Sequence, residues 1–151
     1  MLQLIFTDGE VLYGLHPYSG MIKKIEGDAQ TDVAEIQQEY LYSEDMEAYR
    51  EIRQAVYADK KLYLLLGTDT YEEYDKTELY AFDLDTSEME LVDIEGINSI
   101  MLGAEGTLLI QTNDALSGAA QYDVESGTLG AEVLTVGEDE RIAGIAWDAV
   151  D

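Results

Sequence analysis

The chain has 151 residues, and its 33 acidic and 8 basic residues give a formal net charge of −25 at pH 7. A field of this sign repels phosphate backbones and anionic lipids, so it disfavours nucleic acid and membrane surfaces as partners and attracts cations. The hydrophobic content of 46% argues against disorder, and the lack of Cys excludes disulfides, thiolate metal sites and cysteine nucleophiles. No apolar run approaches the length of a membrane helix, so we expect no membrane insertion.

The first elements along the chain are strands. We expect them at residues 2–7, 10–16 and 21–26, with turns at Asp8-Gly9 and at residues 17–20. Asp-Gly between two apolar stretches is a strong hairpin signal. This first unit therefore has three strands, one fewer than the units that follow.

Residues 28–51 are expected to be an insertion. Asp32-Val-Ala-Glu35 resembles a capping box, and Val33, Ile36 and Tyr40 fall on one helical face. These features predict a short helix, although Tyr40-Leu-Tyr42 could equally extend a strand.

The rest of the chain reads as two further units of four strands. They are expected near residues 52–57, 62–67, 77–84 and 89–94, then near 97–102, 107–112, 119–124 and 129–136, and residues 142–147 begin a fourth unit. The run Leu62–Leu66 is apolar on both faces, as is Leu108–Ile110. Strands of that kind lie in sheets that are covered on both sides.

A repeat underlies these units. Ile52, Ile97 and Ile142 recur at intervals of 45 residues, and each opens a similar phrase: Ile52-Arg-Gln-Ala-Val-Tyr57, Ile97-Asn-Ser-Ile-Met-Leu102 and Ile142-Ala-Gly-Ile-Ala-Trp147. A period of about 40–50 residues made of short strands is typical of a propeller. A sandwich could give the same local pattern, but the fixed period favours an all-β, propeller-like array of four-stranded antiparallel blades.

A second phrase recurs inside the units. Tyr80–Ser87 matches Ala120–Gly127, with a worn copy at Tyr13–Gly20, and each is a strand that ends in a polar hairpin tip. His16, the only histidine, stands where the other copies carry Asp83 and Asp123. These three residues are interpreted as turn-making rather than as catalytic or metal-binding groups.

The longest loop within a unit is the candidate ligand site. It spans residues 67–77 and crowds acidic residues and two tyrosines: Asp69, Tyr71, Glu72, Glu73, Tyr74 and Asp75. Its oxygens could hold Ca²⁺ and its rings could stack on a sugar or peptide, although a solvated hairpin loop explains the same composition. The loop lacks the ligand spacing of an EF-hand, and no catalytic or cofactor motif occurs in the chain. We therefore expect no resident cofactor.

These units resemble the blades of β-propellers in bacterial secreted and surface proteins, in which Asp-x-x-Ser/Thr-Gly hairpins are common. The resemblance covers residues 1–27 and 52–147. It does not extend to the aromatic signature of quinoprotein blades or to WD40 landmarks, so no quinone is implied. It implies a non-enzymatic binding or scaffolding module, extracellular or in the cell envelope. The alternative is a fragment of a propeller hydrolase or lyase whose catalytic residues lie outside this chain.

The expected organisation is a single propeller-like domain, or a fragment of a larger propeller. It divides into blade 1 (1–27), the insertion (28–51), blade 2 (52–96), blade 3 (97–141) and a terminal strand (142–151). The abrupt edges suggest a piece of a longer protein. Protein or carbohydrate ligands are expected, together with self-association through blade faces or strand exchange. In the exchange, two copies form a six-bladed ring and the strand with Trp147 completes the partner's first blade.

Overall fold

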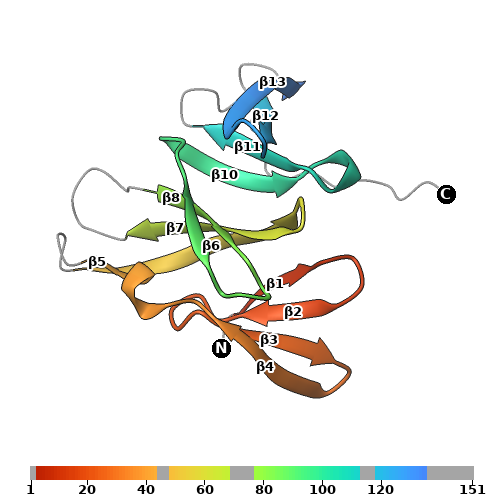
Figure 1. Ribbon diagram of the computed structural model, residues 1–151, viewed down its shortest axis with the longest axis vertical. Helices are drawn as coiled ribbons and strands as arrows, with labels where there is room; N and C mark the ends of the chain where they lie inside the picture. The colour runs from red at the N-terminus through yellow and green to blue at the C-terminus, as the bar shows by residue number, and fades with distance from the viewer. Residues whose placement is uncertain (1–2, 44–47, 69–76, 113–117, 136–151) are drawn as a thin grey trace.

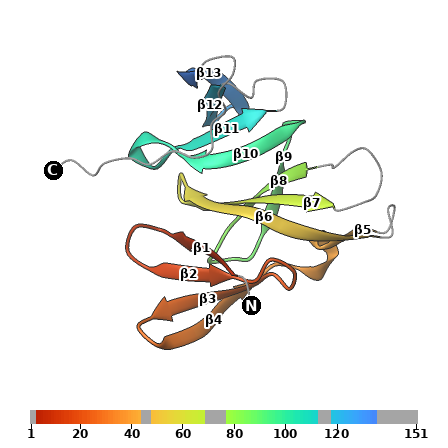
Figure 2. The same cartoon turned by 180° about the vertical axis from the view of Figure 1, so that it is seen from behind.

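The computed structural model describes residues 3–43, 48–68, 77–112 and 118–135. These residues form three antiparallel sheets and two short 3₁₀ turns, with no α-helix in the described ranges. The sheets are stacked one on another, with the second between the other two (Figures 1 and 2). The all-β, blade-like architecture predicted from the 45-residue period is therefore confirmed. Three blades stack without closing into a ring.

Sheet 1 has four strands in chain order. They are β1 (Leu4–Thr7), β2 (Leu12–Leu15), β3 (Met21–Glu26) and β4 (Ala29–Glu35). The Asp8-Gly9 turn joins β1 to β2 as predicted, with Thr7 paired to Leu12. Gly9 has a φ of 100°, which glycine adopts without the steric cost that a Cβ atom would add.

The prediction that residues 28–51 form an insertion with a short helix is wrong. Residues 29–35 form β4, because Gly27 takes a φ of 59° in a two-residue turn that pairs Glu26 with Ala29. The apparent capping box of Asp32 and Glu35 therefore lies within a strand, and blade 1 extends to Glu35. Only the 3₁₀ turn η1 (Gln38–Tyr40) resembles the expected helix.

Sheets 2 and 3 follow the predicted pattern closely. Sheet 2 contains β5 (Tyr42–Ser43), β6 (Ala48–Ala58), β7 (Lys61–Thr68), β8 (Thr77–Phe82) and β9 (Met89–Val92). Sheet 3 contains β10 (Ile97–Leu102), β11 (Leu108–Thr112), β12 (Gly118–Asp123) and β13 (Thr128–Thr135), with the turn η2 (Ala104–Gly106) between its first two strands. The short strand β5 was not predicted.

The recurring isoleucine phrase marks a recurring β-bulge. The pairing of β6 with β7 shifts register between Ile52 and Gln54, and that of β10 with β11 shifts between Ile97 and Ser99. The bulge therefore falls at the same position of the repeated sequence phrase in two blades. The sequence repeat thus corresponds to a repeat in the backbone structure. Beyond a bulge, successive side chains change the face to which they point.

Two apolar layers hold the stack together, and β7 contributes to both. Leu62, Leu64 and Leu66 belong to the core between sheets 1 and 2, whereas Tyr63 and Leu65 belong to the core between sheets 2 and 3. This confirms the prediction that the Leu62–Leu66 run is covered on both faces. Each such side chain contributes about 1.5–3 kcal/mol through burial.

The first blade does not lack a strand. Strand β1 lies against β6 as β6 lies against β10, and sheet 1 reaches four strands through β4 at its far edge. The vacancy that the Trp147 strand was expected to fill is therefore not found in the described residues. Residues 142–147 themselves lie outside the described ranges.

Candidate binding site between the blades

Residues 69–76 of the predicted ligand loop lie outside the described residues. This applies to Asp69 and to all five predicted ligand-binding residues, Tyr71, Glu72, Glu73, Tyr74 and Asp75. The candidate site described below is built from other residues.

The turn-making role expected for the three tip residues is confirmed. Asp83 Oδ1 accepts hydrogen bonds from the backbone amides of Asp85 (2.8 Å) and Thr86 (3.2 Å), and Asp123 Oδ1 accepts one from Glu125 (3.0 Å). His16 Nδ1 plays the same part, because it accepts hydrogen bonds from the amides of Tyr18 (3.3 Å) and Ser19 (3.0 Å).

The position of these tips differs between blades, however. His16 lies between the second and third strands of its sheet, whereas Asp83 and Asp123 lie where the last two strands of theirs are joined. The worn copy at Tyr13–Gly20 therefore repeats the chemistry of the turn and not its place in the blade. The offset explains why β4 was read as part of an insertion.

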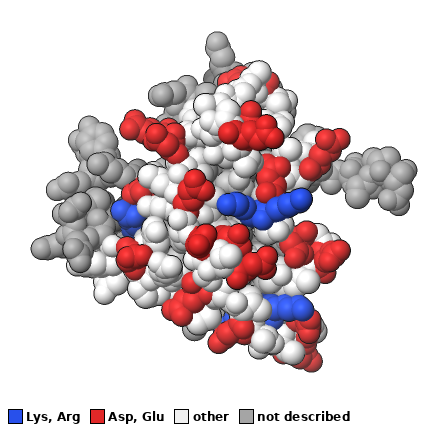
Figure 3. Space-filling model, viewed as in Figure 1, with Lys and Arg blue, Asp and Glu red and all other residues white. Residues whose placement is uncertain are grey.

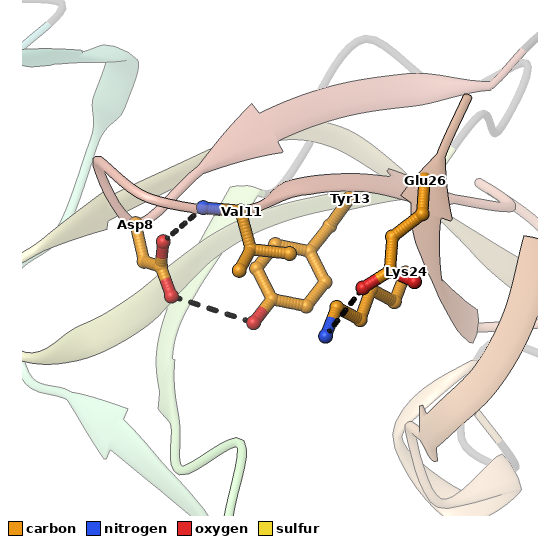
Figure 4. A network of polar contacts seen from close by, with 5 residues as sticks. All are labelled: Asp8, Val11, Tyr13, Lys24 and Glu26. Atoms are coloured by element: carbon orange, nitrogen blue, oxygen red, sulfur yellow. Dashed lines mark hydrogen bonds and ion pairs between the residues drawn. The ribbon is translucent and has the colours of Figure 1, made fainter.

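The turn between β1 and β2 carries a polar network (Figure 4). Asp8 accepts hydrogen bonds from the amides of Val11 (2.8 Å) and Glu10 (2.9 Å), which lower the pKa of its carboxyl group. The Tyr13 hydroxyl donates to the other Asp8 oxygen at 3.4 Å, and Lys24 pairs with Glu26 at 2.8 Å. The network orders the turn and leaves the Asp8 carboxylate at its surface.

A second polar cluster lies at the edge of the first core. Arg50 pairs with Glu78 at 2.9 Å, and the Tyr80 hydroxyl donates to Glu78 at 2.8 Å. Burial raises the pKa of Tyr80, and its hydrogen bond to Glu78 raises it further. The ring of Tyr40 packs edge-on against Tyr80, with centroids 5.3 Å apart. Each charge in this cluster has a partner, so the cluster anchors the link between sheets 1 and 2.

The first seam is the boundary between sheets 1 and 2 at Tyr57. Burial raises the pKa of Tyr57, and the negative charges of Asp8, Asp85 and Asp83 raise it further. These carboxylates come from the β1–β2 turn of one sheet and from the β8–β9 turn of the next. Near the second of these turns lies a hollow of about 430 Å³ lined by Gln37, Tyr40, Lys61, Asp83, Glu88, Met89 and Glu90.

The second seam repeats this arrangement one blade further on. Burial raises the pKa of Tyr63 to about 12, with added contributions from Tyr122, Asp59 and Glu90. Tyr63 and Tyr122 meet edge to face with centroids 6.1 Å apart. Here Asp59 belongs to the β6–β7 turn of one sheet, and Asp123 to the β12–β13 turn of the next.

The second seam also opens into a hollow, of about 670 Å³. It is lined by Asp59, Gln121, Tyr122, Asp123, Val124, Glu125, Gly130, Ala131 and Val133. Three of these residues are acidic and none is basic, whereas the hollow of the first seam contains Lys61. Acidic side chains also cover much of the face seen in Figure 3, and basic ones are sparse there. The second hollow is thus a site of uncompensated negative charge among the described residues.

These seam residues were not singled out as a site from the sequence. Tyr63 is buried in the second core, and Tyr57 packs partly buried against the first. A local signal does exist, since an acidic residue in each first turn is followed by a tyrosine on the next strand, in the pairs Asp8 with Tyr13 and Asp59 with Tyr63. These pairs form part of a site only when the last two strands of the next sheet lie beside them.

Within residues 3–43, 48–68, 77–112 and 118–135, no three His, Asp or Glu side chains are grouped so that they could hold a metal ion. The same residues include no helix that is long and apolar enough to span a membrane.

Comparison with known proteins adds no assignment. No protein-family model matches the chain, and no curated protein matches it in sequence. These comparisons therefore identify no family for the chain. The structure itself shows a stack of three blades with an acidic, tyrosine-containing seam at each of the two boundaries.

Proposed function

We propose that this chain is a non-enzymatic binding or scaffolding module of a bacterial extracellular or cell-envelope protein. The observation that carries the proposal is the repeated seam. In the first seam, Asp8, Asp83 and Asp85 lie near the partly buried Tyr57. In the second seam, the buried Tyr63 has Asp59 and Glu90 near it, and the buried Tyr122 has Glu90 and Asp123. A repeated surface of fixed strands with charged turns presents ligand-contacting groups on a rigid scaffold.

The chemistry of the seams fits protein or carbohydrate ligands. Tyrosine presents both a ring face and a hydroxyl group, and it is enriched in interface cores. Carboxylates accept hydrogen bonds from hydroxyl groups and from cationic side chains. Tyr40 and Tyr122 each line one hollow beside acidic residues, so both hollows combine these two kinds of group.

Binding arrays test the proposal. Purified chain is applied to defined peptides with net charges of both signs and to a panel of neutral and charged glycans. We expect saturable binding to a subset, reduced by Tyr40→Ala or by Tyr122→Ala and unchanged by Tyr49→Ala. Tyr49 serves as the control because it is 77% exposed and lines neither hollow. An absence of binding to every probe contradicts the proposal.

The competing enzyme role has a separate readout. The same preparation is incubated with ester, phosphoester, glycoside and peptide substrates. We expect no turnover above the level of a heat-inactivated sample. Turnover that one point variant abolishes would favour the hydrolase or lyase alternative.

Self-association through blade faces forms part of the proposal. Three blades do not close, and typical propellers have four or more. The outer face of sheet 1 carries Ile5 and Leu12, which are 55% and 45% exposed. We expect dimers by light scattering, favoured by added NaCl because salt screens the charge of both copies, and weakened by Ile5→Asp. A monomer at all salt concentrations would exclude this contact.

A further inference from the structure

The hollow of the second seam combines three features that can recognise a cationic side chain. It has carboxylates, a tyrosine whose side chain is largely buried, and apolar lining residues. We propose that this hollow binds the side chain of an arginine presented by a protein partner. The inference rests on the proposed binding role and names the chemistry of one site within it.

The carboxylates supply the charge. Asp59 belongs to the turn of sheet 2, whereas Asp123 and Glu125 belong to the last turn of sheet 3, so their charges converge from two blades. The ion pairs formed within the described residues involve Lys23, Lys24, Arg50 and Arg53, and none of these pairs includes a carboxylate of the hollow. A cation that enters therefore meets negative charge that no described side chain neutralises.

The tyrosine provides an independent observation. Tyr122 lines the hollow and is only 8% exposed, yet its hydroxyl makes no hydrogen bond within the part of the chain that the structure describes. Buried polar groups of proteins nearly always have a hydrogen-bond partner. A guanidinium group can donate to this oxygen and can also lie against the ring.

The apolar residues that line the hollow beside the carboxylates suit the stem of an arginine. Val124, Ala131 and Val133 line the hollow, and the two valines are 45% and 54% exposed. Gly130 also lines the hollow and adds no side chain to it. An arginine covers such apolar surface with its methylene stem while its charged head reaches the carboxylates.

A pair of peptides tests the proposal. The probe is a blocked pentapeptide with one arginine between glycines, and its control carries citrulline, which has nearly the same shape but no charge. Binding is followed by the backbone amide shifts of the protein. We expect saturable shifts at residues 121–125 and 130–133, with the citrulline peptide about tenfold weaker because the charge is lost.

Protein variants separate the hollow from the general charge of the molecule. Asp59→Asn and Tyr122→Phe should each weaken binding of the arginine peptide by about threefold or more. Asp28→Asn is the matched control, since it removes the same charge from the exposed β3–β4 turn and should leave the affinity unchanged. Amide spectra of each variant verify that the fold is retained.

Three results would overturn the inference: equal binding of the two peptides, shifts elsewhere than the hollow, or an effect of Asp28→Asn as large as that of Asp59→Asn. If the arginine peptide fails while other array ligands bind, the binding role stands and only this assignment fails. Failure of every probe rejects both.

Discussion

The side-chain oxygen of Gln54 on β6 accepts a hydrogen bond of 2.7 Å from the backbone amide of Ile100 on β10. The bulge at Arg53 makes this contact possible. Ile52 faces the first core, and without the bulge Gln54 would face the same side, but the extra residue turns Gln54 toward sheet 3. The equivalent bulge at Asn98 places both Ile97 and Ile100 in the second core. The repeated phrase thus aligns neighbouring blades as well as forming each strand.

Replacing Gln54 by Ala should destabilise the protein by about 1–3 kcal/mol, because the amide of Ile100 loses its partner in a buried place. Urea unfolding measures the change. Gln30→Ala is the control, since Gln30 is exposed on β4 and should lose little stability. Equal losses in the two variants would show that the hydrogen bond between the blades contributes no specific stability.

The turn-making role of His16 can be tested with one variant that removes its acceptor and one that retains an acceptor. His16→Ala removes the acceptor for the amides of Tyr18 and Ser19, and should cost about 0.5–1.5 kcal/mol. His16→Asn retains a neutral acceptor at the same place and should recover most of this loss. Thermal melts of the two variants give the comparison. If Asn is no better than Ala, the hydrogen bonds of this turn are not the source of its stability.

Sheets 2 and 3 were predictable because their strands carry a physical signal. The expected strand at residues 62–67 became Lys61–Thr68, since a strand that is buried on both faces is apolar throughout its length. The period of 45 residues supplied the blade order, and the recurring bulge now explains why the phrase is kept.

Strand β4 escaped prediction for an equally physical reason. All but one of its residues are exposed, so no apolar alternation marks it, and Asp32 and Glu35 imitate a helix start by chance. Its usable signal was Gly27, which allows the turn that pairs β4 with β3. The binding hollow was beyond sequence reasoning, because Asp59 and Tyr122 lie in different blades and meet only through the packing of sheets 2 and 3.

A substitution in the turn between β6 and β7 should make the protein more stable. Asp59 and Lys60 have φ values of 48° and 65°, a conformation that costs most L-residues about 1 kcal/mol and glycine very little. Lys60→Gly should therefore raise the free energy of unfolding by roughly 0.5–1 kcal/mol. Lys61→Gly removes the same charge from a strand position and should lower stability instead. Chemical denaturation of both variants tests the opposite signs, and a loss in Lys60→Gly would contradict the assignment of strain.

The second seam should limit stability in alkali. Burial raises the pKa of Tyr63 to about 12 from its ordinary value of 10.0, so the folded chain holds this proton after the unfolded chain has released it. Stability from Tyr63 is complete below pH 10 and declines as the pH rises from 10 toward 12, by up to about 3 kcal/mol. Urea unfolding at a series of pH values, with tyrosinate absorbance recorded in parallel, measures both quantities. Tyr63→Phe should flatten this decline because it removes the titrating group, whereas Tyr49→Phe, at an exposed tyrosine, should leave it unchanged. An unaltered slope in Tyr63→Phe would show that the alkaline loss arises elsewhere, among the other tyrosines whose pKa is raised by burial.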